Sequence, residues 1–362
     1  MSMNQPFRPP SVPLAVVDPY FSIWSAADRL SDSDTVHWTN KPHRLTGLIR
    51  IDGETLRFMG TAAKPGSAEA EYSVIPQKSL NVEPLTTTYV FEGNGVELEV
   101  RFTTPLLLDD LDLLSRPVSY IAFQARSVDG SAHQVQICLD ISGEWCVNTP
   151  DQRVVWSRGE IGSLTYLRMG TEEQPVLKTS GDDRRIDWGY GYLAAVKSDG
   201  LSTVIHTHQA RAQFAATGRL PETDDSRMPR PVSEDMPIMA AAWDLGEVSD
   251  RPVSRFAMLA YDDIHSIEYF GKPLDAYWRR NGLSFDDMLQ QAAGDYPAVL
   301  DRCAVFNAEL IADSRAAGGE AYKDITSLAY RQAIAAHKLV TDEDGNILFF
   351  SKENFSNGCI AT

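Results

Sequence analysis

The sequence predicts a mainly β protein, in which a large N-terminal β-sandwich is followed by helices from about residue 284. Three observations predict this order. Glycine-centred turns recur between short apolar runs in the first two thirds of the chain, apolar and polar residues alternate within those runs, and the apolar spacing becomes helical after residue 283. Alternation places apolar side chains on one face of a sheet, and two such sheets bury these faces against each other.

Four turns predict antiparallel hairpins in the β part. Glycine adopts the positive φ angle that tight turns require, so each turn marks a chain reversal between two strands. After the last of these strands, the proline-rich stretch 211–237 is predicted to be a long loop. The turns are Asp52-Gly53, Gly93-Asn94-Gly95, Asp129-Gly130 and Asp199-Gly200.

The helical part is predicted to begin after Ser284, whose hydroxyl can accept a hydrogen bond from a backbone N–H group of the first turn. Asp286 and Asp287 then lie in that turn, where the helix dipole favours negative charge. The pair Gly318-Gly319 interrupts the apolar spacing and predicts two antiparallel helices. The second helix is expected to carry an apolar face formed by Ile325, Leu328, Ala329, Ala333, Ala336 and Leu339.

Composition limits the classes of function. The chain has 362 residues, which is enough for two or three domains, and its formal net charge of -17 argues against nucleic-acid binding because it repels phosphate backbones. No window approaches the roughly 18 apolar residues of a membrane span. No export signal is visible, so a cytoplasmic location is expected. The cysteines lack metal-ligand spacing; they are Cys138, Cys146, Cys303 and Cys359.

Five stretches of the chain together resemble the glutaminase A family. They are PPSVPLAVVDPYFSIWS (9–25), HWTNKPHRLTGLIRIDG (37–53), DWGYGYLA (187–194), YDDIHSIEYFGKPLDAYWRRNG (261–282), and YKDITSLAYRQAIAAHKLV with FSKENFSNG (322–358). The resemblance implies an N-terminal β region, a β-sandwich similar to the supersandwich of sugar-processing enzymes, and an (α/α)6 toroid like that of six-hairpin glycosidases. It also implies hydrolysis of L-glutamine to L-glutamate and ammonia, by enzymes of which many are exported.

With this resemblance, the chain is predicted to contain four parts. A complete (α/α)6 toroid needs many more helices than this sequence offers. We therefore expect the N-terminal portion of a longer protein, inactive by itself, whose partner is the missing toroid of the same polypeptide. The parts are an N-terminal β region (1–75), a β-sandwich (76–283), a connecting helix (284–318) and the start of an incomplete toroid (319–362).

The polar cluster FSKENFSNG is the predicted catalytic loop. Amide hydrolysis needs an acid or base and hydrogen-bond donors for the oxyanion. Glu353 is the candidate acid or base and Lys352 its electrostatic partner, whereas Asn354, Asn357 and Ser356 are candidate substrate-binding residues. Ser356 and Cys359 are weaker candidates as nucleophiles, because no histidine lies nearby in the sequence to activate either. The alternative interpretation is a polar turn whose side chains satisfy local backbone groups.

No metal ion or cofactor is predicted. The segment 342–353 nearly matches a calcium-binding loop, but Ile347 stands where that loop needs glycine, so a turn that leads into a strand is preferred. His206 and His208 would share one face of a strand. A third ligand is missing, so they are interpreted as part of a solvated strand face.

Aromatic and charged side chains occur together at Asp187-Trp188-Gly189-Tyr190 and at Trp278-Arg279-Arg280. Such groups bind sugars or amino acids, or they seal an interface, and Tyr277 and Trp278 are interpreted as a wedge between domains. The adjacent acids Asp262-Asp263 are interpreted as solvated carboxylates.

Two further functions stay open beside the glutaminase hypothesis. A protein of the same architecture can cleave glycosides with paired carboxylates. The sandwich alone can also act as a non-catalytic module for ligand binding or assembly. If the protein is an enzyme, its partner is a small-molecule substrate such as glutamine or a related amide. Neither nucleic acid nor a membrane is expected as a partner.

Overall fold

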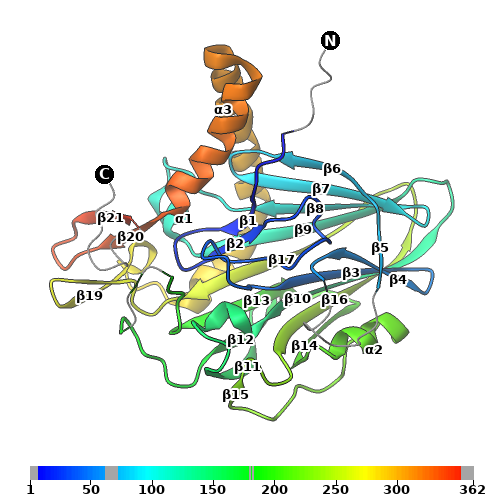
Figure 1. Ribbon diagram of the computed structural model, residues 1–362, viewed down its shortest axis with the longest axis horizontal. Helices are drawn as coiled ribbons and strands as arrows, with labels where there is room; N and C mark the ends of the chain where they lie inside the picture. Colours follow the sequence, from blue (N-terminus) through cyan, green and yellow to red (C-terminus); the bar gives the residue numbers. More distant parts are fainter. Residues whose placement is uncertain (1–6, 62–71, 179–180, 182, 352–362) are drawn as a thin grey trace.

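Two stacked sheets form the body of the protein, and helices cover their outer faces (Figure 1). The computed structural model describes residues 7–61, 72–178, 181 and 183–351. One sheet has nine strands and the other six, and the strands pair antiparallel except for β4 with β5. The predicted sandwich followed by helices is confirmed. Among the described helices, none combines the length and the apolar character that a bilayer crossing requires.

The nine-stranded sheet carries most of the β structure and packs one face against the second sheet. In spatial order its strands are β15 (Arg230–Pro231), β11 (Arg153–Ile161), β12 (Leu164–Thr171), β13 (Tyr190–Val196), β17 (Val253–Asp262), β9 (Val118–Ser127), β8 (Val96–Thr103), β7 (Thr86–Gly93) and β6 (Gln77–Val82).

The six-stranded sheet and two small sheets complete the β structure. The six strands, in spatial order, are β14 (Leu201–Thr207), β16 (Pro237–Val248), β10 (His133–Ser142), β3 (Leu45–Ile51), β4 (Glu54–Met59) and β5 (Ser73–Val74). The two small sheets are β1 (Val12–Val16) with β2 (Ser22–Ser25), and β18 (Ile267–Tyr269), β19 (Lys272–Ala276), β20 (His337–Thr341) and β21 (Ile347–Ser351).

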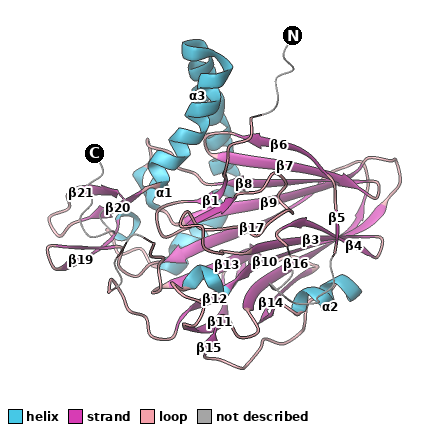
Figure 2. Ribbon diagram, viewed as in Figure 1, coloured by secondary structure: helices cyan, strands magenta, loops and turns pink. Residues whose placement is uncertain are grey.

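Helices lie on opposite sides of the sandwich, as Figure 2 shows for α2 and α3. α3 packs on the outer face of the nine-stranded sheet, where the ring of Phe285 lies 4.3 Å from that of Tyr192 in β13, and α2 packs on the outer face of the six-stranded sheet through Phe214. The helical elements are α1 (Leu111–Ser115), the 3-10 turn η1 (Gly143–Cys146), α2 (Ala210–Thr217), the 3-10 turn η2 (Tyr277–Arg279) and α3 (Phe285–Ala335).

α3 is a helical hairpin, as predicted. Its first turn is capped by Ser284, whose hydroxyl accepts a hydrogen bond from the backbone N–H of Asp287 at 3.1 Å. The chain reverses at Gly319, where φ is 74° and ψ is -166°. Glycine suits this conformation because a Cβ atom would strain it. The two arms of the hairpin rise side by side above the sheets in Figure 1.

Alternating side chains fill the space between the two sheets. In β8, Leu98, Val100 and Phe102 are fully buried, as their spacing predicts. Phe123 of β9 meets Trp243 of β16 across the interior, with ring centroids 5.6 Å apart. Each such buried side chain contributes about 1.5–3 kcal/mol of burial free energy. The core between the sheets contains no residue of α1, α2 or α3.

Two of the four predicted hairpins are confirmed and two are wrong. The turns at 52–53 and 93–95 join β3 to β4 and β7 to β8, which pair as neighbours. The turns at 129–130 and 199–200 instead lead from the nine-stranded sheet into the six-stranded sheet. Both edges of β9 are already paired, with β8 and β17, so β10 finds its partners in the other sheet. A turn residue indicates that the chain reverses, but it does not determine which strand the next strand pairs with.

Two local predictions also change in the structure. The stretch predicted as a loop begins with α2, because Phe214 is fully buried and docks the helix on the sheet. Leu339 lies in β20 and not in the second helix, which ends at Ala335. Ile325 is 63% exposed, so the second arm of α3 turns part of its apolar surface away from the sandwich.

A buried arginine fastens the second arm of α3 to the sandwich. Arg331 is fully buried and donates to the carbonyl oxygens of Pro84 at 2.9 Å and Pro13 at 3.0 Å, and to the Thr87 hydroxyl at 2.8 Å. Burial lowers the pKa of Arg331 to about 9, although Glu83 opposes the shift. The hairpin is therefore held to β1 and β7 by a cation that binds mainly neutral acceptors.

His133 links the turn between β3 and β4 to the turn between β9 and β10, and this link predicts that the stability of the protein depends on pH. His133 places Nδ1 2.6 Å from Asp52 and Nε2 3.1 Å from Asp129, and these hydrogen bonds raise its pKa above the ordinary 6.5. A raised folded-state pKa gives stability that is complete below 6.5 and is lost as pH rises through the folded value.

We expect His133→Gln to lower the free energy of unfolding by up to about 1 kcal/mol at pH 5.5 and by much less at pH 9. Urea unfolding at the two pH values measures this difference. His206→Gln makes the same replacement in a strand of the six-stranded sheet and is the matched control. An equal loss at both pH values for His133→Gln would contradict the ion-pair explanation.

Candidate functional site

The predicted catalytic loop lies outside the described residues, since all five of its candidates fall within 352–362. The structure does place the strands that lead into it. β21 ends at Ser351, which pairs with His337 of β20, and the next residue of β20 is Lys338. The candidates in question are Lys352, Glu353, Asn354, Ser356 and Asn357.

The five stretches that carry the family resemblance meet at one end of the sandwich. Lys338, from the last stretch, contacts Asp18 from the first and Asp263 from the fourth. Trp188, from the third, donates from Nε1 to the Asp263 carbonyl at 2.7 Å. Trp38, from the second, donates to the carbonyl that directly follows Asp18 in the chain, at 3.0 Å. We call this meeting point the motif junction; it comprises Asp18, Tyr20, Trp38, Trp188, Asp263 and Lys338.

A buried ion triad forms the centre of the motif junction. The Nζ atom of Lys338 lies 2.6 Å from Asp18 Oδ2 and 2.8 Å from Asp263 Oδ2, and none of the three residues is more than 5% exposed. Asp18 Oδ1 accepts two backbone N–H groups, one of them from Tyr20, and Asp263 Oδ2 also accepts the Ser266 hydroxyl at 2.7 Å. Pairing of this kind is what makes buried charge tolerable.

Lys338 and Asp263 are both charged at ordinary pH. Burial alone would lower the pKa of Lys338, but Asp18 and Asp263 outweigh burial and raise it above its usual value. Burial alone would raise the pKa of Asp263, but the Lys338 ammonium and the Ser266 hydroxyl lower it. Lys338 and Asp263 therefore do not exchange protons near neutrality. The chemistry of the triad is to hold three chain segments in a fixed arrangement.

Aromatic side chains enclose the triad. Tyr20 meets Trp188 edge-on with centroids 5.3 Å apart, donates its hydroxyl to the Ser266 carbonyl at 2.5 Å, and has Lys338 Nζ 5.6 Å from its ring centre. Burial, with added repulsion from Asp263 and Asp18, raises the pKa of Tyr20 well above 10. The phenol therefore stays neutral and acts as a donor.

Two neutral histidines lie beside the motif junction, and sequence reasoning missed them. His37 Nε2 lies 3.1 Å from the Pro19 carbonyl, and its ring is 4.9 Å from that of His43. Burial lowers the pKa of His37 to about 3 and that of His43 well below 6.5. A general base works best with a pKa near the operating pH, so neither ring suits that role.

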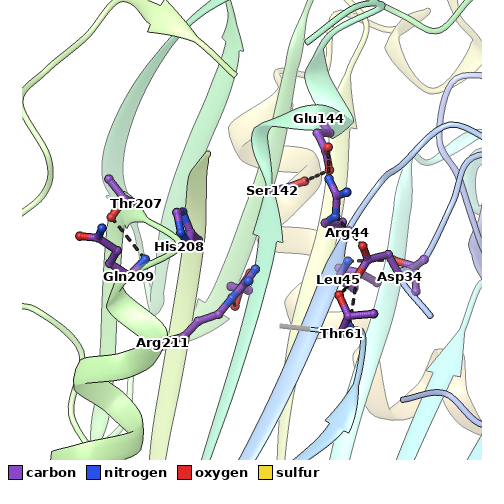
Figure 3. Close-up of polar contacts among 12 residues, drawn as sticks. Asp34, Arg44, Leu45, Thr61, Ser142, Glu144, Thr207, His208, Gln209 and Arg211 are labelled. Carbon is purple, nitrogen blue, oxygen red and sulfur yellow. Dashed lines mark hydrogen bonds and ion pairs between the residues drawn. The ribbon is translucent and has the colours of Figure 1, made fainter. Parts of the chain in front are cut away.

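A second cluster of ionised side chains contains two carboxylates. Glycoside hydrolysis requires such a pair, with one member acting as the proton donor. Figure 3 shows Arg44 between Asp34 and Glu144, with its Nε atom 2.7 Å from Asp34 Oδ2 and Nη1 bonded to Glu144. Thr61 donates to Asp34 at 2.6 Å, and Ser142 donates to Glu144 at 2.8 Å. Burial would raise the pKa of Asp34, but Thr61 and Arg44 lower it. Asp34 is therefore a poor proton donor, unlike the acid of a glycosidase.

The interpretation of Asp262 and Asp263 as solvated acids is wrong. Asp263 is 2% exposed within the triad, and Asp262 pairs with Arg279 at the end of β17. β20 and η2 cover the end of β17 through Lys338 and Arg279. The acidic composition of the chain gave no sign of this burial. Trp278 is buried and meets Phe285 of α3 edge-on at 6.1 Å, the kind of contact expected of a wedge. The domain boundaries themselves stay predictions.

Protein contacts account for both metal-like patterns. His208 lies beyond the end of β14 and is 5% exposed, so it does not share a solvated strand face with His206 as interpreted from the sequence. The Asp342 carboxylate accepts the backbone N–H groups of Asp344 at 3.0 Å and Asn346 at 2.8 Å, which confirms the turn before β21. Within the described residues, no group of three or more His, Cys, Asp or Glu side chains suits a metal ion.

Sequence reasoning also missed Asp18 and Lys338, although each leaves a signal. Lys338 is the single charge in AIAAHKLV, and Asp18 is the single charge in PPSVPLAVVDPYFSIWS. A lone charge in an apolar run predicts a buried ion pair, because burying a charge without a partner is costly. The identity of the partner does not follow from either run.

Comparisons with known proteins agree with the resemblance. Residues 85–313 match the family model described as "Domain of unknown function (DUF5127)", residues 1–65 match DUF4964, and residues 319–362 match the "Glutaminase A six helical-hairpin domain". Glutaminase A of Aspergillus oryzae is 31% identical over 100% of this chain and 53% of its own length. A probable glutaminase of Arthroderma benhamiae is 24% identical over 97% of the chain and 43% of its own length.

The chain thus spans about half the length of the curated relatives it matches. Among solved structures, a protein designated a kojibiose phosphorylase, from the human microbiome, overlaps 89% of this chain and 39% of its own, with 8% identity and a TM-score of 0.46. A TM-score this low supports no conclusion about function. The DUF5127 match covers more than half of the sequence, and the named relative aligns with all of it. The chain therefore belongs to the DUF5127 family and is a glutaminase A-like member of it.

Proposed function

We propose that the protein is an amidohydrolase that converts L-glutamine to L-glutamate and ammonia. The alignment with Glutaminase A over the whole chain supports this proposal. The observation that carries it furthest is that all five family-like stretches, dispersed in the sequence, converge on the motif junction.

In this proposal the motif junction holds the base of the catalytic segment. Lys338 ties β20 to the N-terminal segment and to the end of β17, and β20 pairs with β21, which leads into residues 352–358. Glu353 serves as acid or base and Lys352 as its electrostatic partner. The amides of Asn354 and Asn357 and the Ser356 hydroxyl bind the substrate.

Parallel assays test the proposal. The purified full-length protein, with its toroid, is given L-glutamine, L-asparagine and a set of oligosaccharides, and ammonia and reducing sugar are measured. We expect ammonia from L-glutamine and no reducing sugar. Release of sugar without ammonia would reject the amidohydrolase and favour a glycoside hydrolase, and saturable glutamine binding without turnover would favour a binding module.

A further inference from the structure

The second arm of α3 has an exposed face that carries no charge. Between residues 321 and 335 the exposed positions hold only alanine, tyrosine, isoleucine and glutamine, and Tyr322 and Ile325 are 49% and 63% exposed. The first arm differs, because its exposed positions include charged residues such as Asp301, Glu309 and Asp313. A helix that faces water normally carries charged and polar side chains on that side. The second arm therefore lacks the surface of a solvated helix.

Four of these exposed residues form a stripe along one side of the helix, which we call the apolar stripe: Tyr322, Ile325, Ala329 and Ala333. They are three, four and four positions apart, which is the spacing of residues that lie above one another on an α-helix. Ala329 and Ala333 are small, so another helix can approach to the short end of the usual interaxial distance of about 8–10 Å. The apolar stripe thus has the shape of a helix-packing surface.

The opposite side of the second arm is already packed. Arg331 is fully buried against β1 and β7, and Ser327 is 2% exposed. Tyr330 lies 4.9 Å from Phe306 of the first arm, between ring centroids, and donates its hydroxyl to the Leu106 carbonyl at 2.7 Å. The sandwich and the first arm therefore use one side of this helix, and the apolar stripe lies on the side that they leave exposed.

The family models divide α3 at its bend. The match to DUF5127 ends at residue 313, and the match to the six helical-hairpin domain begins at residue 319, where the chain reverses. The first arm thus falls in the same family model as most of the sandwich, whereas the second arm falls in a domain of helical hairpins. Helices in such a domain bury their apolar stripes against one another. Among the described residues α3 is the only long helical hairpin, and the chain spans about half the length of its curated relatives.

We propose that, in the full-length protein, the apolar stripe is the contact surface for a later helix of the same hairpin domain. That helix presents apolar side chains to the stripe and no charge, because the stripe offers no counter-charge and an unpaired buried charge is costly. This inference concerns the assembly of the domain. It therefore stands or fails separately from the turnover of glutamine.

Cysteine labelling of the full-length protein tests the proposal. Ile325→Cys places a thiol on the apolar stripe, Ala212→Cys places one at an exposed position of α2, and Ser327→Cys places one at a buried position of the same arm. Peptide mass spectrometry measures maleimide modification at each site separately from the natural cysteines. We expect Ile325→Cys to react at least about tenfold more slowly than Ala212→Cys, because a packed site reacts only when it opens. Equal rates for these two variants, both shown to be folded by near-UV circular dichroism, would overturn the proposal.

The 362-residue chain identifies which molecule covers the apolar stripe. In this chain Ile325→Cys should react as fast as Ala212→Cys at every protein concentration, because the later helix is absent. Slow reaction that becomes fast on dilution would show that a second copy of the chain covers the stripe, and it would reject the assignment. Slow reaction at every concentration would contradict the exposure of Ile325 from which the proposal starts.

A stability measurement tests the same contact without labelling. Ala329→Arg places a long charged side chain where the later helix approaches, and it should lower the thermal midpoint of the full-length protein by at least about 4 °C. The 362-residue chain, in which this position is exposed, should change by less than about 1 °C. Ala212→Arg makes the same replacement on exposed α2 and should alter neither protein by more than that. An unchanged midpoint for full-length Ala329→Arg protein would reject the contact.

Discussion

Replacing Lys338 with Met is expected to lower the free energy of unfolding by about 3–5 kcal/mol, the usual cost of removing one partner from a buried ion pair. The substitution preserves most of the side-chain volume but leaves Asp18 and Asp263 buried together without their cation. Typical domains are stable by only 5–15 kcal/mol, so this loss is a large fraction of the total. Chemical denaturation at pH 7 measures it.

The pH dependence of the two proteins should differ in sign. In the parent, the lowered pKa of Asp263 gives stability above its ordinary value of 3.8 that is lost as pH falls through the folded value, and the raised pKa of Lys338 gives stability below 10.5 that is lost as pH rises through the folded value. Without the lysine, burial and mutual repulsion raise the carboxylate pKa values instead. The variant should therefore lose less stability at pH 5 than at pH 8.

Two further proteins separate charge from packing. Lys338→Met combined with Asp18→Asn and Asp263→Asn removes all three charges and should recover most of the loss, since the hydrogen-bonded oxygens remain. Lys197→Met breaks an equally short but exposed pair, 2.7 Å from Glu160, and should cost no more than about 1 kcal/mol. A similar loss for Lys338→Met and Lys197→Met would show that the triad does not hold the motif junction.

Local patterns predicted local features of this molecule well. The alternation in β8 identified Leu98 and Phe102 as core residues because a strand turns every second side chain to the same face. Ser284 and Gly319 marked the start and the reversal of α3 because both act through the conformation of the chain around them. These predictions need no knowledge of distant residues.

Features that depend on distant residues could not be predicted in the same way. Lys338 and Asp18 are 320 positions apart, and nothing in either run specifies the other. The choice of β16 and β3 as neighbours of β10 likewise depends on which strand edges are already occupied. Motif resemblance indicated which stretches matter, and the structure showed that they meet.

Replacing Glu353 with Gln is the second large prediction, and it rests on the proposed function. Positioned acid–base catalysis contributes about 10²–10⁴-fold, so kcat of the full-length protein for L-glutamine should fall by that factor while KM changes little. Gln retains the shape of the side chain and can still form hydrogen bonds, but it does not ionise and therefore cannot act as an acid or a base. Glu343→Gln is the matched control, because Glu343 lies in the turn before β21, is paired with exposed Lys272, and should not alter turnover.

The pH–rate profile distinguishes a catalytic carboxylate from a structural one. Lys352→Met removes a cation next to Glu353 in the chain, and loss of a nearby cation raises a carboxyl pKa. If Glu353 acts as a base, the acidic limb of kcat/KM should move to higher pH in that variant, because the limb reports the free enzyme's essential base. A structural role would lower activity without moving the limb. An active Glu353→Gln enzyme would remove this residue from the mechanism and leave the chemistry to another part of the protein.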